Sequence, residues 1–140
     1  GEMSGHIFFS DGFYGFDDAI FSGARLLKLV ADSSHSIRWL LRDVPEIYNT
    51  PEIKIQTRED LKFKIVRRLQ EHFNKEYETV TIDGVRISFK HGWGLVRASN
   101  TGPNLVLRFE ANSSKQLARI RSLVESKVMD VISDMNQECG

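Results

Sequence analysis

The spacing of apolar residues predicts helices and a short strand in the first third of the chain. The apolar run at 6–9 has the length of a strand. Over residues 20–30, apolar side chains recur every three or four positions, which is the period of an amphipathic helix. Asp17 or Asp18 can begin this helix, because a carboxylate is stabilised at the positive helix N-terminus. A second short helix is expected over 34–41.

The pattern changes after this second helix. Residues 42–50, which include Pro45, are expected to form a loop. Alternating apolar residues then predict a strand over 52–56. Over residues 61–73 the apolar positions return to the helical period, and Thr57 is a plausible N-cap for that helix.

Several strands are predicted in the middle of the second half. The runs 79–82 and 85–89 flank Asp83-Gly84, a pair that favours a two-residue type I′ hairpin turn. Residues 92–96 form another strand-like run, and apolar residues alternate again over 105–109. Because the connections between these runs are short, neighbouring strands should pair antiparallel.

The last element predicted is a long helix. It begins at Ser113 or Ser114, and its apolar residues keep the helical period as far as Met135. The order is therefore β-α-β-β-β-α, and the expected fold class is α+β. We expect a four-stranded, largely antiparallel sheet covered by two helices. A short strand and a helical segment that belong to a preceding domain come before this sheet. The expected domains are 1–46 and 47–140.

Composition limits the classes of partner. The chain has 140 residues, of which 41% are hydrophobic, and its 19 basic and 19 acidic residues give a formal net charge of +0. Proteins that bind nucleic acid usually carry a basic excess, so no nucleic-acid partner is expected. No apolar run approaches the ~20 residues that span a bilayer, and no signal peptide is visible, so no membrane partner is expected. The single cysteine, Cys139, allows no disulfide framework and suits a reducing cytoplasm.

Two polar features of the sequence have simple structural explanations. The adjacent Asp17 and Asp18 are explained by helix capping, and no histidine or carboxylate spacing marks a metal site. Arg108 alternates with apolar neighbours and is expected to face solvent.

The densest group of hydrogen-bond donors lies at 97–103. Arg97 can offer two parallel N–H groups to an oxyanion, and Ser99, Asn100 and Thr101 can each donate from the side chain. A phosphate has the size and charge to accept them. The residues alone leave two interpretations open, because turns rich in Ser, Asn, Thr, Gly and Pro are common.

This segment resembles the phosphate-binding loop of the α-D-phosphohexomutase superfamily, R-x-S-N-T-x-P, at Arg97, Ser99, Asn100, Thr101 and Pro103. The resemblance implies that the loop binds a substrate phosphate. Many relatives have Pro and Glu at the two variable positions, where this chain has Ala and Gly; neither difference removes a proposed phosphate ligand.

The first six residues resemble the sugar-recognition loop of the same superfamily, in the version G-E-M-S-G-H that is typical of bacterial phosphomannomutase/phosphoglucomutase. The resemblance implies that Glu2 and Ser4 recognise sugar hydroxyls, for which a carboxylate and a hydroxyl are suitable partners. His6 can contact the substrate or be a hydrogen-bonded structural histidine; its chemistry leaves both open, and the resemblance favours the active site.

The resemblance implies a C-terminal fragment of a phosphohexomutase: 1–46 as the end of a sugar-binding third domain and 47–140 as the fourth, phosphate-binding domain. The full enzyme would move phosphate between O1 and O6 of a hexose, through a 1,6-bisphosphate of glucose or mannose. Superfamily members use a phosphoserine and a D-G-D-G-D loop for Mg²⁺, and this chain contains neither motif. The fragment is therefore expected to bind a hexose phosphate beside the remaining domains of the enzyme, with no catalytic residue and no metal ligand of its own.

Two other functions stay open. One is a fragment of a phosphoglucosamine mutase, although those enzymes tend to have Gln where this chain has Met3. The other is a stand-alone anion-binding or interaction module without catalysis. The sequence does not choose between mannose and glucose.

Overall fold

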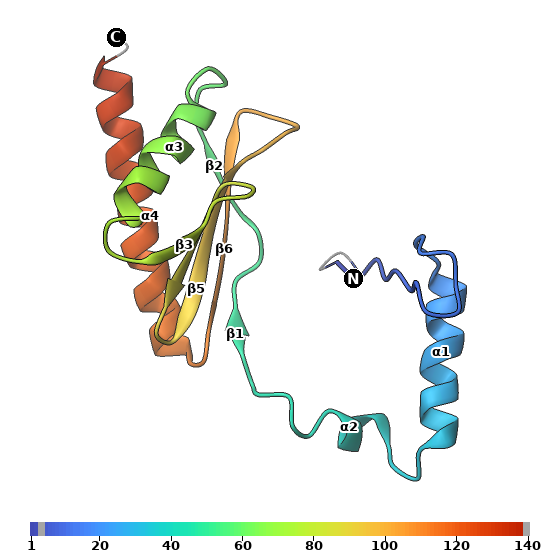
Figure 1. Ribbon diagram of the computed structural model, residues 1–140. Coiled ribbons are helices and arrows are strands. Elements are labelled where there is room, and N and C mark those ends of the chain that lie inside the picture. Colours follow the sequence, from blue (N-terminus) through green and yellow to red (C-terminus); the bar gives the residue numbers. More distant parts are fainter. Residues whose placement is uncertain (3–4, 139–140) are drawn as a thin grey trace. The chain divides into compact units, whose positions relative to one another are not determined.

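The computed structural model describes residues 1–2 and 5–138, and the chain divides into two compact units, Gly1–Pro45 and Glu46–Gly140. The first unit contains α1 (Ala19–Asp32) and the short α2 (Ile37–Leu40) (Figure 1). Among its described residues, none is buried. The apolar side chains of Ile20 and Leu27 are 87% and 71% exposed, so α1 lacks a core within the described part of this unit.

The start of α1 follows the capping prediction in part. The Asp18 carboxylate accepts a hydrogen bond from the Phe21 N–H at 2.8 Å and caps the helix. Asp17 does not cap; it pairs with Phe8 in an isolated β-bridge, which is all that remains of the strand predicted at 6–9.

The second unit is an antiparallel sheet with two long helices. Its strands and helices, in chain order, are β1 (Tyr48–Asn49), β2 (Ile53–Gln56), α3 (Lys62–Phe73), β3 (Glu78–Val80), β4 (Val85–Phe89), β5 (Gly92–Ala98), β6 (Asn104–Ala111) and α4 (Ser114–Glu138). The strand order is β1-β6-β5-β4-β3, and β2 pairs with the same β6. Every pair is antiparallel. The α+β class is confirmed, with six strands rather than four.

Five of the six strands match the five strand-like runs of the sequence, one more than the four-stranded expectation, and the sixth, β1, lies in the segment predicted as a loop. β1 and β2 run along the same strand, β6, and Thr50 joins them: its N–H donates to Phe109 O at 3.0 Å, and its Oγ1 accepts the Phe109 N–H at 3.2 Å. Asn49 lies opposite Glu110, whereas Ile53 lies opposite Leu107, so the edge strand contains one extra residue. Pro51, which has no N–H to donate, lies at this irregularity. A strand of two residues is too short to show the alternation of apolar and polar residues by which strands are recognised in a sequence.

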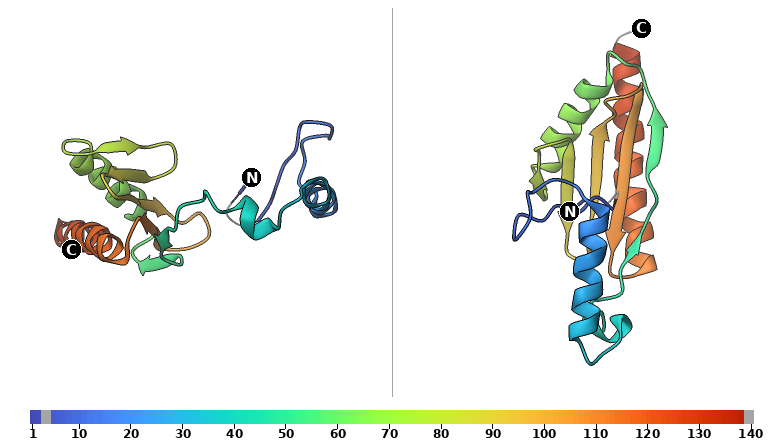
Figure 2. Two further views of the ribbon diagram at one scale, coloured as in Figure 1. Left: turned by 90° about the horizontal axis from the view of Figure 1, so that it is seen from below. Right: turned by 90° about the vertical axis from the view of Figure 1, so that its right-hand side faces the viewer.

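Helices α3 and α4 cover the same face of the sheet (Figures 1 and 2). Their apolar stripes meet the inward-facing residues of β4, β5 and β6 in one core. The largest side chains in it that are at most 1% exposed are Phe73, Phe109, Leu61, Ile65, Leu69, Ile87, Leu105 and Leu107. Each such burial stabilises the fold by about 1.5–3 kcal/mol. Alternation along β5 sends Val96 and Ala98 into the core and Arg97 to the opposite, open face.

Helix α3 begins later than predicted. It starts at Lys62, and Thr57 does not cap it. The Thr57 N–H donates to Pro103 O at 2.9 Å, which holds this residue next to the β5–β6 loop. Asp60 instead accepts from the Arg58 guanidinium at 2.8 and 3.1 Å. The Thr57 hydroxyl, which would have capped the helix, is buried without a hydrogen-bond partner among the described residues.

The β3–β4 turn also differs from the prediction. Type I′ requires positive φ at both central residues, but of this pair only Gly84 has it, at +83°. Four residues, 81–84, separate the strands. A Cβ on Gly84 would lie 2.2 Å from Val96 O and 2.8 Å from Arg97 Cα. The glycine therefore lets the turn pack directly against the backbone of β5, where the candidate phosphate loop begins.

No helix within residues 1–2 and 5–138 is both long and apolar enough to cross a membrane.

Candidate functional site

The candidate phosphate loop joins the two strands in the middle of the sheet, β5 and β6. Arg97 is the last residue but one of β5, and its side chain is 32% exposed on the open face. A guanidinium nitrogen of Arg97 lies 3.9 Å from the Asp83 carboxylate, which is itself 70% exposed. An exposed ion pair of this length contributes little, so Arg97 can exchange it for a more strongly charged anion.

The loop has its own hydrogen bonds. The Ser99 N–H donates to Asn104 O at 2.9 Å, and the Asn104 N–H donates to Gly102 O at 2.8 Å. The Thr101 N–H donates to Ser99 Oγ at 3.2 Å, and the two hydroxyl oxygens lie 3.3 Å apart. These bonds restrain the loop conformation, which lowers the entropy cost of binding a ligand.

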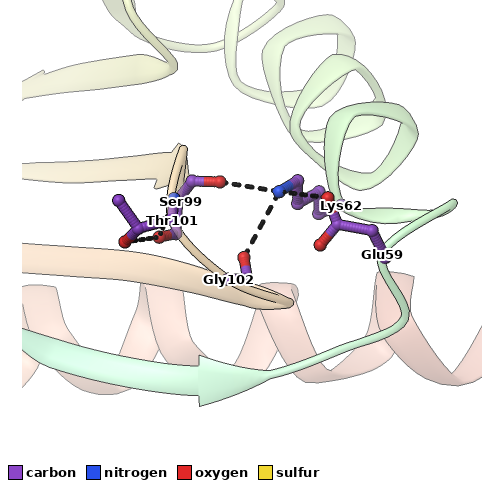
Figure 3. A network of polar contacts seen from close by, with 5 residues as sticks. All are labelled: Glu59, Lys62, Ser99, Thr101 and Gly102. Carbon is purple, nitrogen blue, oxygen red and sulfur yellow. Dashed lines mark hydrogen bonds and ion pairs between the residues drawn. The ribbon is translucent and has the colours of Figure 1, made fainter.

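A buried lysine supports the loop from behind. Lys62 is 3% exposed, and its Nζ donates to Ser99 O at 2.7 Å and to Gly102 O at 3.3 Å (Figure 3). Sequence reasoning missed this residue. The available signal was its place on the buried stripe of α3, three residues before Ile65 and seven before Leu69, where a lysine is unusual.

Arg108 was expected to face solvent, but it is half-buried. It pairs across strands with Leu95, next to the pairing of Arg97 with Val106, so both arginines lie on the open face. The structure thus brings a second guanidinium to the face that carries Arg97. Arg97, with the exposed Asn100 and Thr101 at the loop, can hold an oxyanion by charge and hydrogen bonds.

Two of the predicted sugar-binding residues, Glu2 and His6, lie close together in the first unit. The Glu2 N–H donates to His6 O at 2.7 Å, and the Gly5 N–H donates to Glu2 O at 3.1 Å, with Gly5 at φ +93°. Ser4 lies outside the described residues.

His6 forms an ion pair with the carboxylate of Asp17, which sequence reasoning had assigned to capping alone. The hydrogen bond to Asp17, and next the charge of Asp17, raise the pKa of His6 above its ordinary value. Asp17 thus favours the protonated imidazole, a form that can donate to a substrate oxygen.

Two models of one protein family match most of the chain. The family model described as "Phosphoglucomutase/phosphomannomutase, C-terminal domain" matches residues 52–127. The chain belongs to this family. The model of the family's "alpha/beta/alpha domain III" matches residues 1–48.

Several members of the phosphoglucomutase/phosphomannomutase family resemble the chain over most of its length. A phosphomannomutase/phosphoglucomutase of Pseudomonas putida is 47% identical over 132 residues, which is 94% of this chain and 28% of that protein. A phosphoglucomutase of Neisseria gonorrhoeae is 42% identical over 125 residues, 87% of this chain and 27% of that protein. The crystal structure of a family member from Burkholderia thailandensis has a TM-score of 0.80 at 41% identity and covers 94% of this chain and 28% of its own. The chain thus spans less than a third of these relatives.

The described residues of this phosphoglucomutase/phosphomannomutase family member do not form a site for a bound metal ion. Among those residues, no group of three or more His, Cys, Asp or Glu side chains could hold a metal ion. The Mg²⁺ that the resemblance implies for a full enzyme would need ligands elsewhere, so no chemical step here is assigned to it.

Proposed function

We propose that this chain is the C-terminal part of a phosphomannomutase/phosphoglucomutase, and that its β5–β6 loop binds a phosphate of the hexose phosphate. The observation that carries the proposal is the ordered loop itself. Arg97, Ser99, Asn100 and Thr101 stand together on one loop whose conformation is held by its own hydrogen bonds and by Lys62. The relatives with 42–47% identity named above support the substrate class.

The loop has no general acid or base of its own, so its proposed role is binding rather than catalysis. In the full enzyme it would hold the phosphate that is not reacting, while the hexose is converted between its 1-phosphate and 6-phosphate through a bisphosphate. Phosphoryl transfer requires a metal and a donor to position and neutralise the moving group. We propose that Mg²⁺ and the phosphoserine belong to other parts of the enzyme, and that this chain alone binds without turnover.

The first unit is proposed to be part of the sugar-binding third domain. Its apolar residues have no core among the described residues, which is expected of a segment that normally packs against the rest of a larger domain. Glu2 and Ser4 would bind sugar hydroxyls, and His6, whose pKa is raised by Asp17, would donate to a substrate oxygen.

The test is a titration of the 140-residue chain with inorganic phosphate and with glucose 1-phosphate, followed through backbone amide NMR signals. We expect signals of residues 97–101 to shift and Arg97→Ala to abolish the shifts. Arg119→Ala, which removes an exposed arginine of α4 on the helix-covered side, is the matched control and should bind as the parent does. An absence of shifts in this loop at millimolar ligand would refute the proposal.

The substrate is tested in the same titration. Glucosamine 1-phosphate tests the alternative that the chain is a fragment of a phosphoglucosamine mutase. A probable phosphoglucosamine mutase of Pyrococcus horikoshii is 32% identical to the chain over 122 residues. If that ligand binds at least tenfold more tightly than glucose and mannose 1-phosphates, a difference of about 1.4 kcal/mol, the alternative replaces the proposal.

A further inference from the structure

The proposed phosphate loop rests on a lysine that would not itself touch the phosphate. Lys62 is the first residue of α3, and its side chain is almost completely buried at 3% exposure. Lysines are almost never fully buried unless their charge is paired. A buried lysine therefore needs a structural reason, and its contacts supply one.

The ammonium group of Lys62 has three N–H donors and three acceptors. Its Nζ lies 2.7 Å from Ser99 O, 3.3 Å from Gly102 O and 2.6 Å from the Glu59 carboxylate (Figure 3). Two of these acceptors are backbone carbonyls at the two ends of the loop. The third is a side chain that is 65% exposed and can be changed without touching the loop.

The contact with Ser99 O sets the direction of the next N–H group. No cis peptide bond is present in the described residues, so the Ser99–Asn100 peptide is trans. In a trans peptide the carbonyl and the N–H point in opposite directions. Because the carbonyl points at Lys62, the Asn100 N–H points away from it. Within residues 1–2 and 5–138, no acceptor takes that N–H.

The contact with Gly102 fixes the other end of the loop. Gly102 O accepts from both Lys62 and the Asn104 N–H. The following residue is Pro103, which has no N–H, so this peptide cannot be stabilised from its other side. Lys62 thus draws both carbonyls inward and leaves the Asn100 N–H to the outside.

We propose that Lys62 is the positioning residue of the phosphate loop: it turns the Ser99–Asn100 peptide so that the Asn100 N–H is presented to the bound phosphate. This inference rests on the proposed function of the loop. Without the ammonium group, Ser99 O would be left buried without a donor, and rotation of the peptide would satisfy it at the expense of the outward N–H.

The direct test compares Lys62→Met with Glu59→Gln in the 140-residue chain, using inorganic phosphate and amide NMR. Methionine keeps an apolar side chain in the buried site but donates nothing. We expect Lys62→Met to weaken phosphate binding at least tenfold, which corresponds to about 1.4 kcal/mol, and to move the Asn100 amide signal in the free protein. Glu59→Gln keeps both carbonyl contacts and should bind within about twofold of the parent. Equal losses in the two variants would overturn the proposal.

One control separates positioning from a general loss of stability. Val66→Ala removes apolar volume from the same helix without touching the loop, so it should lower thermal stability and leave the phosphate Kd unchanged. A Val66→Ala Kd that rises as much as that of Lys62→Met would show that the loss follows stability and would overturn the positioning role.

If Lys62→Met does not fold, the parent protein itself supplies the test. The side-chain ammonium of Lys62 should give a slowly exchanging ¹⁵N signal that shifts when phosphate saturates the loop. Failure of the two proposals is distinguishable. If the parent binds no phosphate, the proposed function is wrong. If the parent binds but the Lys62 ammonium signal does not respond, or the Lys62→Met Kd equals the parent's, only the positioning role is wrong.

Discussion

Substituting Gly84 by alanine measures how closely the β3–β4 turn packs against the strand that carries Arg97. The new Cβ would lie 2.2 Å from Val96 O and 2.8 Å from Arg97 Cα, both backbone atoms that cannot move independently. The residue would also keep a φ of +83°, which disfavours any side chain. The left-handed backbone costs about 1–2 kcal/mol and overpacking typically about 1–3 kcal/mol. We therefore expect a loss of about 2–5 kcal/mol in the free energy of unfolding of the second unit.

The assay is urea unfolding followed by tryptophan fluorescence. The two tryptophans lie in different units, so a Trp39→Phe background leaves Trp93 as the reporter of the second unit. With an m-value of about 2 kcal/mol/M, the midpoint should fall by about 1–2.5 M urea. Gly102→Ala is the control. Its Cβ would meet only the flexible end of Asn104 at 3.2 Å, and it should change stability by less than about 0.5 kcal/mol. A Gly84→Ala midpoint within about 0.3 M of the parent would refute the close packing.

Three further predictions concern the ionisable pairs and the core. Asp17→Asn should lower the pKa of His6 toward its ordinary value in an imidazole NMR titration. In the parent protein the ion pair between His6 and Asp17 is fully present below the ordinary histidine pKa. It is lost as the pH rises through the raised pKa of His6. Arg68→Gln should raise the pKa of Glu138, because the hydrogen bond from Arg68 holds it below its usual range. The pair between Arg68 and Glu138 is present above the ordinary carboxyl pKa and is lost as the pH falls through the lowered pKa of Glu138. A carboxyl ¹³C titration that gives Glu138 the same pKa in Arg68→Gln and in the parent would contradict this prediction. Phe109→Ala, at a side chain 1% exposed, should cost about 3–5 kcal/mol in the same urea assay.

The features that the sequence predicted well depend on local patterns. The apolar periods of α3 and α4 placed both helices against one face of the sheet, because a 3.6-residue period needs only a single buried side. The loop at 97–103 was recognised as one group of donors because its residues are adjacent in the chain. The α1 cap at Asp18 is equally local.

The features that the sequence did not predict depend on contacts between distant residues. Lys62 reaches carbonyls 37 and 40 positions away, and a lysine in a helix otherwise indicates a solvated face. Thr57 fits the pattern of an N-cap, but its N–H donates to the distant Pro103 O and its hydroxyl does not cap α3. Asp17 likewise forms an ion pair with His6, which lies 11 positions away in the chain. The proposed binding roles of Arg97, Glu2 and Ser4 stay predictions until a ligand is titrated.

The two edges of the sheet have a consequence for how this unit behaves at high concentration. One edge is β3, with three residues that include the exposed Glu78. The other is the β1–β2 strand, interrupted at Pro51 and displaced there by one residue. Short, charged or proline-containing edges are poor templates for strands of other molecules. The second unit therefore resists edge-to-edge aggregation, which makes residues 46–140 a suitable segment to express by itself for spectroscopy at millimolar concentration.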